Sequence, residues 1–365
     1  MSKTVAAELW GTVPPVQNHC TIAHPAARPV RIRRDLRDLF VGAYGMFAAR
    51  CRAIDEPGIA VVGIEESSGR PAGVLTLLAR VQRYVAGIVG RHDACDLFLH
   101  GCGDLALRQL AVVLEPVHSW APRSTQIRYR VLDLRTSTGF FDESGRPLRG
   151  LRCEGPAIMR CGGFALFVLP LGDPTDWPES AGDAWAMMPE RVYIDELERG
   201  PAGSMPMPIA GERRFNVPGP ASLATIAKGT CVTGANMRSS VILRTHGPRE
   251  TGASFARAGD HAGSLELIGR QHRGTLTLGD SALRDGVLLG RYARCDGAGL
   301  LDDPSLSRVH GLLLQLDTSL VFVDTASRNG SRMRGEPDRR LFVLDSGSEL
   351  ELGHATRARW RWGDA

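Results

Sequence analysis

The most constraining feature of this chain is a motif that occurs twice, with the two copies about 200 residues apart. Each copy opens with a Gly-Arg pair and a nearby Cys-Asp pair. It continues with a four-residue block that contains an arginine, and closes with a seven-residue block that runs from Asp to Gly. Three matched blocks in the same order indicate a duplicated domain. The first copy consists of Gly90-Arg91, Cys95-Asp96, 107–110 and 133–139, and the second of Gly290-Arg291, Cys295-Asp296, 307–310 and 324–330.

The length and composition predict the domain organisation and the fold class of the chain. A chain of 365 residues is longer than one ordinary core requires and predicts two domains with a linker. Its 42 Gly and 22 Pro, with short apolar runs between them, are typical of strands and turns. We therefore expect an all-β chain with two β-sandwiches. The expected segments are an N-terminal segment over 1–57 with a helix over 35–51, a first sandwich over 58–171, a linker over 172–259 and a second sandwich over 260–365.

The expected helix and linker each depend on a local pattern. Leu36, Leu39, Phe40, Ala43 and Phe47 recur at three- and four-residue intervals, which predicts one apolar helix face. That face packs on its own domain or, alternatively, on a partner. The 172–259 segment is rich in Pro and Gly, and its Pro-containing pairs do not suit central strands. We expect a long linker there, with ordered pieces near 191–197 and 240–243.

The second copy resembles the forkhead-associated (FHA) domain, a β-sandwich whose loops bind phosphothreonine peptides. The resemblance extends from about 264 to 362. It rests on four elements, each weak alone and specific in combination because they occur in order between strand-like runs. The elements are Gly290-Arg291, Ser307-x-x-His310, Asn329-Gly330 and the closing Asp345-Ser346-Gly347 block.

The resemblance implies roles for five binding residues. A phosphothreonine carries nearly two negative charges and three acceptor oxygens, so its site needs a fixed cation and neutral donors. Arg291 would grip the phosphate, Ser307 would donate its hydroxyl to it, and Arg308 would add positive charge nearby. Asn329 would hold the peptide backbone beside the phosphorylated residue. Arg328 is a candidate for reading a residue C-terminal to the phosphothreonine.

Three further residues would support the site without binding the ligand. His310 would tie the loops together, Gly290 would permit the tight backbone before Arg291, and Gly330 would follow the binding asparagine. Each binding residue also has an ordinary interpretation when taken alone. Arg291 would then be a solvated surface charge, and Ser307 a turn residue. The combination, not any one residue, predicts the site.

The first copy has lost polar residues at the positions matched by spacing. It keeps Arg91, but Leu107 stands for Ser307, Leu110 for His310 and Thr138 for Asn329. A leucine cannot donate to a phosphate, and desolvating a dianion beside leucines is costly. We expect a degenerate FHA-like sandwich that serves as a docking surface or packs against its sibling. Whether Arg91 still binds an anion is left open.

The chain lacks the signatures of several other classes of protein. The net charge of +4 is too small for duplex binding, so we expect no nucleic-acid partner. No two of the eight cysteines have Cys-x-x-Cys spacing, and His19, Cys20 and His24 have no partner pair, so no metal site is expected. Phosphate-binding loops, nucleophile elbows and kinase motifs are absent, so we expect no cofactor and no catalysis.

The expected localisation is cytoplasmic. Scattered thiols suit a reducing compartment, the first residues lack a signal-peptide pattern, and no apolar run reaches the roughly 20 residues of a membrane span.

These expectations combine into one function and two alternatives. We expect a non-catalytic adaptor in Ser/Thr kinase signalling whose second sandwich binds a phosphothreonine-containing partner, such as a kinase or its substrate. The first alternative is a scaffold subunit whose sandwiches bind partners independently of phosphate. The second is an enzyme with an unrecognised site in 172–259. The sequence identifies neither the kinase nor the phosphosite.

Overall fold

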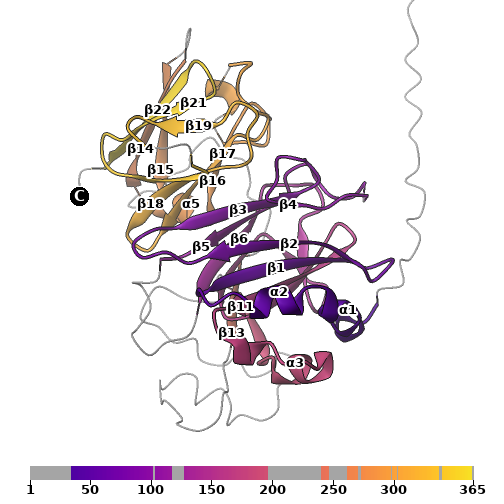
Figure 1. Cartoon of the computed structure of the whole chain (residues 1–365). Helices are drawn as coiled ribbons and strands as arrows, with labels where there is room; N and C mark the ends of the chain where they lie inside the picture. Colours follow the sequence, from indigo (N-terminus) through magenta and orange to yellow (C-terminus); the bar gives the residue numbers. More distant parts are fainter. Residues whose placement is uncertain are drawn as a thin grey trace, which may run out of the picture. The chain divides into compact units, whose positions relative to one another are not determined.

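The computed structural model describes most of the chain, in two β-sandwiches with a few short helices (Figure 1). This confirms the expected all-β class. His19, Cys20 and His24 lie outside the described residues, as does most of the expected linker. The described helices are too short and polar to span a bilayer. The described residues are 34–101, 103–116, 127–195, 240–245, 261–269, 273–296, 298–301, 303–336 and 339–363, with only the backbone described at 192, 194–195, 240–245 and 299.

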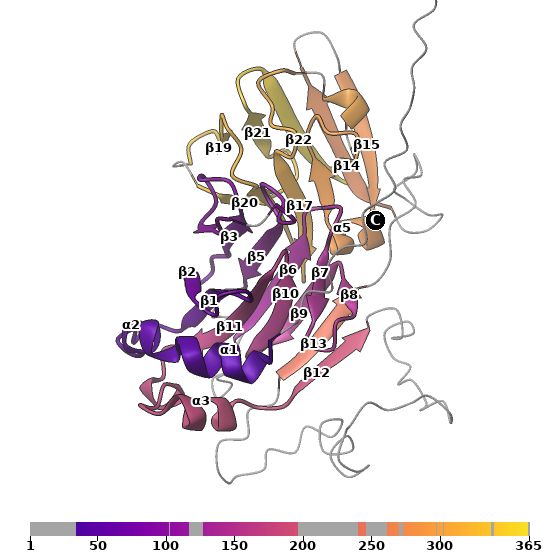
Figure 2. The same ribbon diagram turned by 90° about the vertical axis from the view of Figure 1, so that its right-hand side faces the viewer.

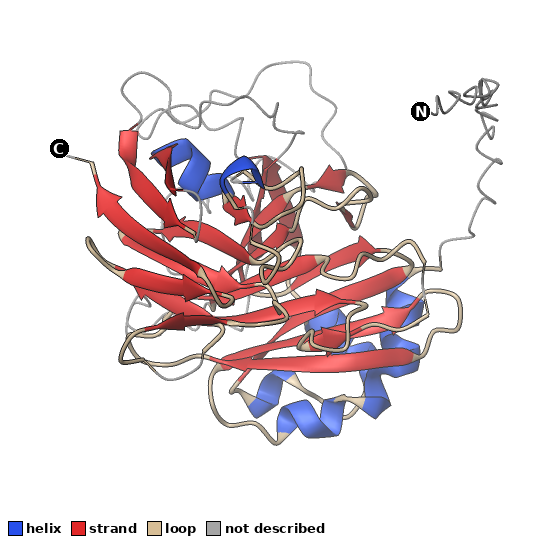
Figure 3. Ribbon diagram, turned by 90° about the horizontal axis from the view of Figure 1, so that it is seen from above, coloured by secondary structure: helices blue, strands red, loops and turns tan. Residues whose placement is uncertain are grey.

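Three short helices precede the first strand, in the place where the apolar pattern predicted one helix. They are α1 (Leu36–Ala43), η1 (Tyr44–Met46) and α2 (Ala48–Arg52). Asp35 caps α1 because its Oδ1 accepts from the backbone N–H of Arg37 at 2.7 Å. The helix changes to a 3₁₀ turn around Gly45, a residue of low helix propensity. The buried faces of α1 and α2 pack on one sheet of the first sandwich (Figures 1 and 3).

The first sandwich consists, in the described residues, of a six-stranded and a seven-stranded sheet. The strand orders are β2-β1-β11-β10-β7-β8 and β12-β13-β9-β6-β5-β3-β4 (Figure 2). Apolar side chains of both sheets form one core between them. The strands are β1 (Gly58–Glu65), β2 (Pro71–Leu78), β3 (Val85–Gly90), β4 (Leu97–Phe98), β5 (Leu110–Leu114), β6 (Arg128–Asp133), β7 (Phe140–Asp142), β8 (Pro147–Leu148), β9 (Gly150–Glu154), β10 (Ala157–Cys161) and β11 (Phe164–Leu171).

Ordered pieces of the expected linker pack on this first sandwich. They are η3 (Pro174–Asp176), α3 (Ala181–Met187), the edge strand β12 (Arg191–Asp195) and its parallel neighbour β13 (Ser240–Thr245), which joins β12 to β9. Trp177 is buried, and Tyr44 donates its hydroxyl to the carbonyl of Pro178 at 2.7 Å. The rings of Phe40 and Trp185 lie 5.5 Å apart. The segment after β11 therefore covers the same sheet face as α1.

The second sandwich contains, in the described residues, a five-stranded sheet and a four-stranded sheet. Their orders are β15-β14-β22-β21-β19 and β16-β17-β18-β20, and the completely buried Trp360 lies in the core between them. The elements are β14 (His261–Ile268), β15 (Arg273–Gly279), α5 (Asp280–Asp285), β16 (Val287–Leu289), η5 (Ala298–Leu300), β17 (Gly311–Leu316), β18 (Ser319–Asp324), β19 (Ser331–Met333), β20 (Leu341–Leu344), β21 (Glu349–Leu352) and β22 (Thr356–Trp362).

One sheet from each sandwich meets the other in a shared apolar cluster. In β5, Val112 faces the first core, while Ala111 and Val113 face this cluster. In β17, Leu313 faces the second core, while Leu312 and Leu314 face the cluster. Because side chains alternate between the faces of a strand, both faces of these strands are buried. This explains why they are continuous apolar runs instead of alternating ones.

Ion pairs link the two sandwiches around this cluster. Asp96 and Asp296 each accept a hydrogen bond from a backbone N–H of their own sandwich, at 2.7 and 2.8 Å. Each is also paired with an arginine of the other sandwich: Arg340 contacts Asp96 at 2.9 Å, and Arg135 donates to Asp296 at 2.8 Å. The repeated Cys-Asp block therefore places an aspartate at the interface in both copies.

Candidate functional site

Arg291 follows β16 on a loop that is hydrogen-bonded to the loop before β17. A Cβ at Gly290 would lie 2.3 Å from the carbonyl oxygen of Arg308, so only glycine permits this approach. The backbone N–H of Arg291 donates to the carbonyl of Ser307 at 3.3 Å, and its Nε donates to the carbonyl of Leu306 at 2.6 Å. Arg291 is exposed. The hydrogen bond from Nε thus fixes the position of the guanidinium, although the residue is exposed to solvent.

His310 is completely buried and connects three segments. Its Nδ1 accepts from the backbone N–H of Ser307 at 3.1 Å, so the proton of the neutral ring is on Nε2. Nε2 lies 3.2 Å from Oγ of Ser331, and the ring also interacts with the backbone at Gly330. Burial lowers the pKa of His310 below its ordinary value, and the Asp324 carboxylate opposes that shift. The histidine is therefore a neutral structural link.

The hydroxyl of Ser307 and the side chain of Asn329 connect the two loops of the site. Oγ of Ser307 accepts from the backbone N–H of Arg328 at 2.9 Å, which leaves the hydroxyl proton available for another acceptor. Nδ2 of Asn329 donates to the carbonyl of Ser305 at 2.6 Å. Arg308 and Arg328 are exposed. The contacts thus bring the 305–308 and 328–329 segments together, with exposed arginines on both.

Asp324 organises the loop that carries Arg328 and Asn329, a role the sequence analysis did not assign. Its carboxylate accepts from the backbone N–H of Ser327 at 2.7 Å, from its hydroxyl at 2.6 Å and from the hydroxyl of Ser331 at 2.7 Å. The signal was present in the sequence, because both copies of the seven-residue block begin with Asp.

The lowered pKa of His310 predicts a loss of stability in acid. The unfolded chain binds a proton on this histidine near pH 6.5, whereas the folded protein binds it only at lower pH. The contribution of His310 is therefore complete above pH 6.5 and decreases as the pH falls toward the folded pKa. Hydrogen exchange of β17 and β18 between pH 5 and 7.5, with intrinsic rates corrected, measures this. We expect His310→Gln to reduce the pH dependence; an unchanged dependence would assign it to other groups.

The first copy reproduces the contacts of the second, but shifted by one residue. Arg91 Nε donates to the carbonyl of Leu105 at 2.6 Å, where Arg291 uses Leu306. The backbone N–H of Gln109 donates to Val89 at 2.8 Å, where His310 uses Leu289. One residue fewer thus separates Asp96 from this block than separates Asp296 from its counterpart. The assignment of Leu107 to Ser307 and of Leu110 to His310 is therefore wrong: Ala106 and Gln109 occupy those places.

Gln109 performs in the first copy what His310 performs in the second. It is completely buried, its Oε1 accepts from the backbone N–H of Ala106 at 2.9 Å, and its Nε2 donates to the carbonyl of Gly139 at 2.9 Å. Thr138 stands at the place of Asn329 and donates to the carbonyl of Asp104 at 3.3 Å. The polar framework is thus retained, whereas Ala106 has no hydroxyl to offer a phosphate. Leu107 is only half-buried.

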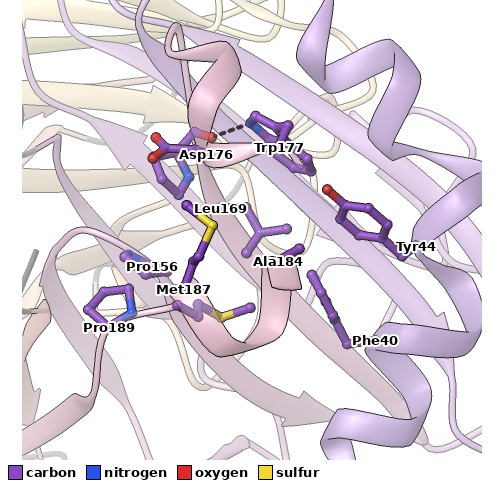
Figure 4. Close-up of a pocket in the computed structure, with 11 residues that line it drawn as sticks. Phe40, Tyr44, Pro156, Leu169, Asp176, Trp177, Ala184, Met187 and Pro189 are labelled. Atoms are coloured by element: carbon purple, nitrogen blue, oxygen red, sulfur yellow. Dashed lines mark hydrogen bonds between the residues drawn. The ribbon is translucent and has the colours of Figure 1, made fainter. Parts of the chain in front are cut away.

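The first sandwich also contains a cavity of about 120 Å³ between α1 and α3 (Figure 4). Its lining is mostly apolar and includes Phe40, Tyr44, Trp177 and Met187. The indole Nε1–H of Trp177 already donates to the carbonyl of Pro170 at 3.1 Å. This lining does not suit a phosphate group. Within the part of the chain that the structure describes, no cluster of His, Cys, Asp and Glu could hold a metal ion.

Comparison with known proteins finds one family model that matches part of the second sandwich. The family model described as FHA domain matches residues 287–353, which include Gly290, Arg291, Ser307, His310 and Asn329. No curated protein matches the chain. Residues 287–353 are thus an FHA domain, and they contribute β16 to β21 to the two sheets of the second sandwich.

Similar solved structures include three with FHA domains or phosphopeptides in their descriptions. The FHA domain of the CT664 protein from Chlamydia trachomatis is 20% identical, with 28% of this chain and 99% of that chain covered and a TM-score of 0.25. Mycobacterium tuberculosis EmbR in complex with a low-affinity phosphopeptide is 21% identical (31% and 27% covered, TM-score 0.25). The yeast Dun1 FHA domain with a doubly phosphorylated Rad53 peptide is 19% identical (33% and 84% covered, TM-score 0.26).

Proposed function

We propose that this FHA-domain protein is a non-catalytic adaptor that binds a phosphothreonine-containing partner through the loops of its second sandwich. The observation that carries the proposal is the hydroxyl of Ser307. It accepts from the backbone of Arg328, keeps its own proton for an acceptor, and lies between loops that expose Arg291, Arg308 and Arg328. A fixed hydroxyl donor among guanidinium groups is what a phosphate dianion requires.

The proposed roles follow from the contacts of each residue. Arg291 grips the phosphate with the amino groups of its guanidinium, because Nε is committed to the carbonyl of Leu306. Arg308 adds positive charge from the same loop. Asn329 uses Nδ2 within the protein, and its amide oxygen has no hydrogen-bond partner among the described residues. That oxygen accepts from a backbone N–H of the bound peptide.

Arg328 occupies a different position with respect to the ligand. Its backbone is fixed to Ser307, while its side chain is exposed and can extend along the peptide beyond the phosphothreonine. We assign it to a residue C-terminal to the phosphothreonine. Because the ligand is a phosphorylated threonine, the protein acts downstream of a Ser/Thr kinase, and the partner is that kinase or one of its substrates.

The first sandwich supports a second candidate function. It keeps Arg91 and the buried polar framework but lacks a hydroxyl at Ala106, and one of its sheets is buried against the second sandwich. We propose that this degenerate copy does not bind phosphothreonine. It packs on its sibling and offers its remaining surface to a partner independently of phosphate, as a scaffold subunit would.

The phosphothreonine specificity can be tested with matched peptides. The FHA resemblance implies a small apolar niche for the γ-methyl group of the threonine. We expect phosphoserine peptides to bind more weakly by roughly 1–3 kcal/mol, the contribution of one methyl group in a well-fitted pocket. Calorimetry with the full chain and peptides that differ only at this residue measures the difference. Equal affinities would indicate a general anion site and would contradict the proposed mode of binding.

A further inference from the structure

Two arginines of the first sandwich extend across the interface to the two loops of the candidate site. Arg108 donates from Nε, at 3.0 Å, and from Nη2 to the carbonyl of Ala326, in the loop that carries Arg328 and Asn329. Arg135 donates from Nη1 to the carbonyl of Arg294 at 3.0 Å, in the loop that begins at Arg291. Both loops are therefore bonded to the other sandwich.

The contact with Ala326 falls where the loop conformation is least favourable. Ala326 is buried and has φ of +59°, in the left-handed region that residues with a Cβ rarely adopt. The fork of Arg108 fixes the direction of its carbonyl. The N–H of the same peptide group, which belongs to Ser327, donates to Asp324, and the N–H of the next peptide group, which belongs to Arg328, donates to Ser307. Two successive peptide groups, both held by side chains, thus connect Arg108 to the hydroxyl of Ser307.

This support is not shared equally between the copies. By the contacts of the two loops, Val309 stands where Arg108 stands, and Ala326 stands where Arg135 stands. The second sandwich therefore has no arginine at either position, so it cannot make the two corresponding hydrogen bonds to the loops of the first copy. Its own interface arginine, Arg340, instead pairs with Asp96. The asymmetry follows the proposed division of function: the copy without the serine supplies the supports, and the copy with the serine receives them.

We infer that the first sandwich is a built-in support for the phosphothreonine site, with Arg108 and Arg135 as positioning residues for its two loops. The inference rests on the proposed function. It assigns to the degenerate copy a part in phosphopeptide binding that requires no ligand contact of its own.

The test compares two pairs of interface arginines in the full chain. The test variant is Arg108→Ala with Arg135→Ala. The control is Arg130→Ala with Arg152→Ala, because Arg130 donates to the carbonyl of Arg284 at 2.7 Å and Arg152 to Asp317 at 2.9 Å, both outside the site loops. The probe is an oriented peptide library with one fixed phosphothreonine. The test variant is expected to bind it about threefold to thirtyfold more weakly, the range typical of energetic coupling between sites, and the control to bind it as the original protein does.

Hydrogen exchange without any peptide separates positioning from general loosening. In the test variant the amides of 324–331 and 291–296 are expected to exchange faster while the core strands are unchanged, and Arg108→Lys, which keeps one donor, is expected to restore part of the protection. Unchanged loops, or equal effects of both double variants on the loops, would overturn the inference. If the original protein binds phosphorylated and plain libraries equally, the proposed function fails, while the exchange result still decides whether the loops are supported.

Discussion

Replacing Arg291 with alanine is expected to abolish most phosphopeptide affinity without unfolding the protein. Arg291 is exposed, and among the described residues its guanidinium makes one hydrogen bond, from Nε to the carbonyl of Leu306. Loss of a charge-assisted contact to a phosphate costs about 2–5 kcal/mol of binding free energy. Calorimetry with the full chain and matched phosphorylated and plain peptides measures the loss, and circular dichroism checks the fold.

Arg294 provides the control for a simple loss of charge. It lies in the same loop, is exposed, and stacks its guanidinium over the ring of Tyr292 at 5.6 Å. Arg294→Ala removes the same charge near the site without removing the proposed phosphate ligand, so we expect a much smaller effect. If both variants lose affinity equally, the loop contributes only a diffuse positive field and Arg291 has no specific role.

Replacing Gln109 with leucine is expected to destabilise the first sandwich by about 2–5 kcal/mol, because several buried polar groups lose their partners at once. The N–H of Ala106 and the carbonyl of Gly139 would be left without the bonds that they now make at 2.9 Å, and Thr136 would lose its bond at 2.6 Å. Urea denaturation, with hydrogen exchange of β5 and β6 to assign the transition, measures the change.

Leu107 is the matched control for this prediction. It lies two residues away and is the residue that the spacing of the motif matches to Ser307. Because it is only half-buried, Leu107→Ala is expected to cost about 1 kcal/mol or less, below the range for a buried leucine. A larger loss at Leu107 than at Gln109 would contradict the structural role assigned to Gln109.

The error in the sequence alignment has a specific cause. Arg108 and Arg308 match by letter at a spacing of 200, and this match concealed a deletion between Asp96 and Leu105. Only the backbone contacts show that Arg108 occupies the place of Val309. The result changes the interpretation of the first copy: the place of the histidine is taken by a buried amide that makes corresponding bonds to the backbone, not by a leucine.

The β-sandwich fold could be predicted because strands and turns depend on nearby residues. Gly290 approaches the backbone of Arg308 and His310, and His310 bonds to Ser307, all within a short span of chain, so the spacing of these residues carries the information. The interface between the sandwiches could not be predicted in this way. Val113 and Leu314 belong to apolar runs whose pattern shows that both strand faces are buried. The pattern does not show which other part of the protein covers the second face. Packing of residues 174–188 on α1 was missed for the same reason.

The most direct test of the account is retention of an oriented phosphothreonine library by the full chain, measured against the same library treated with phosphatase. We expect the phosphorylated library to be retained and the treated library not to be, and we expect Ser307→Ala and Arg291→Ala each to remove most of the difference. Equal retention of the two libraries by the original protein would contradict the central claim that its second sandwich recognises phosphothreonine.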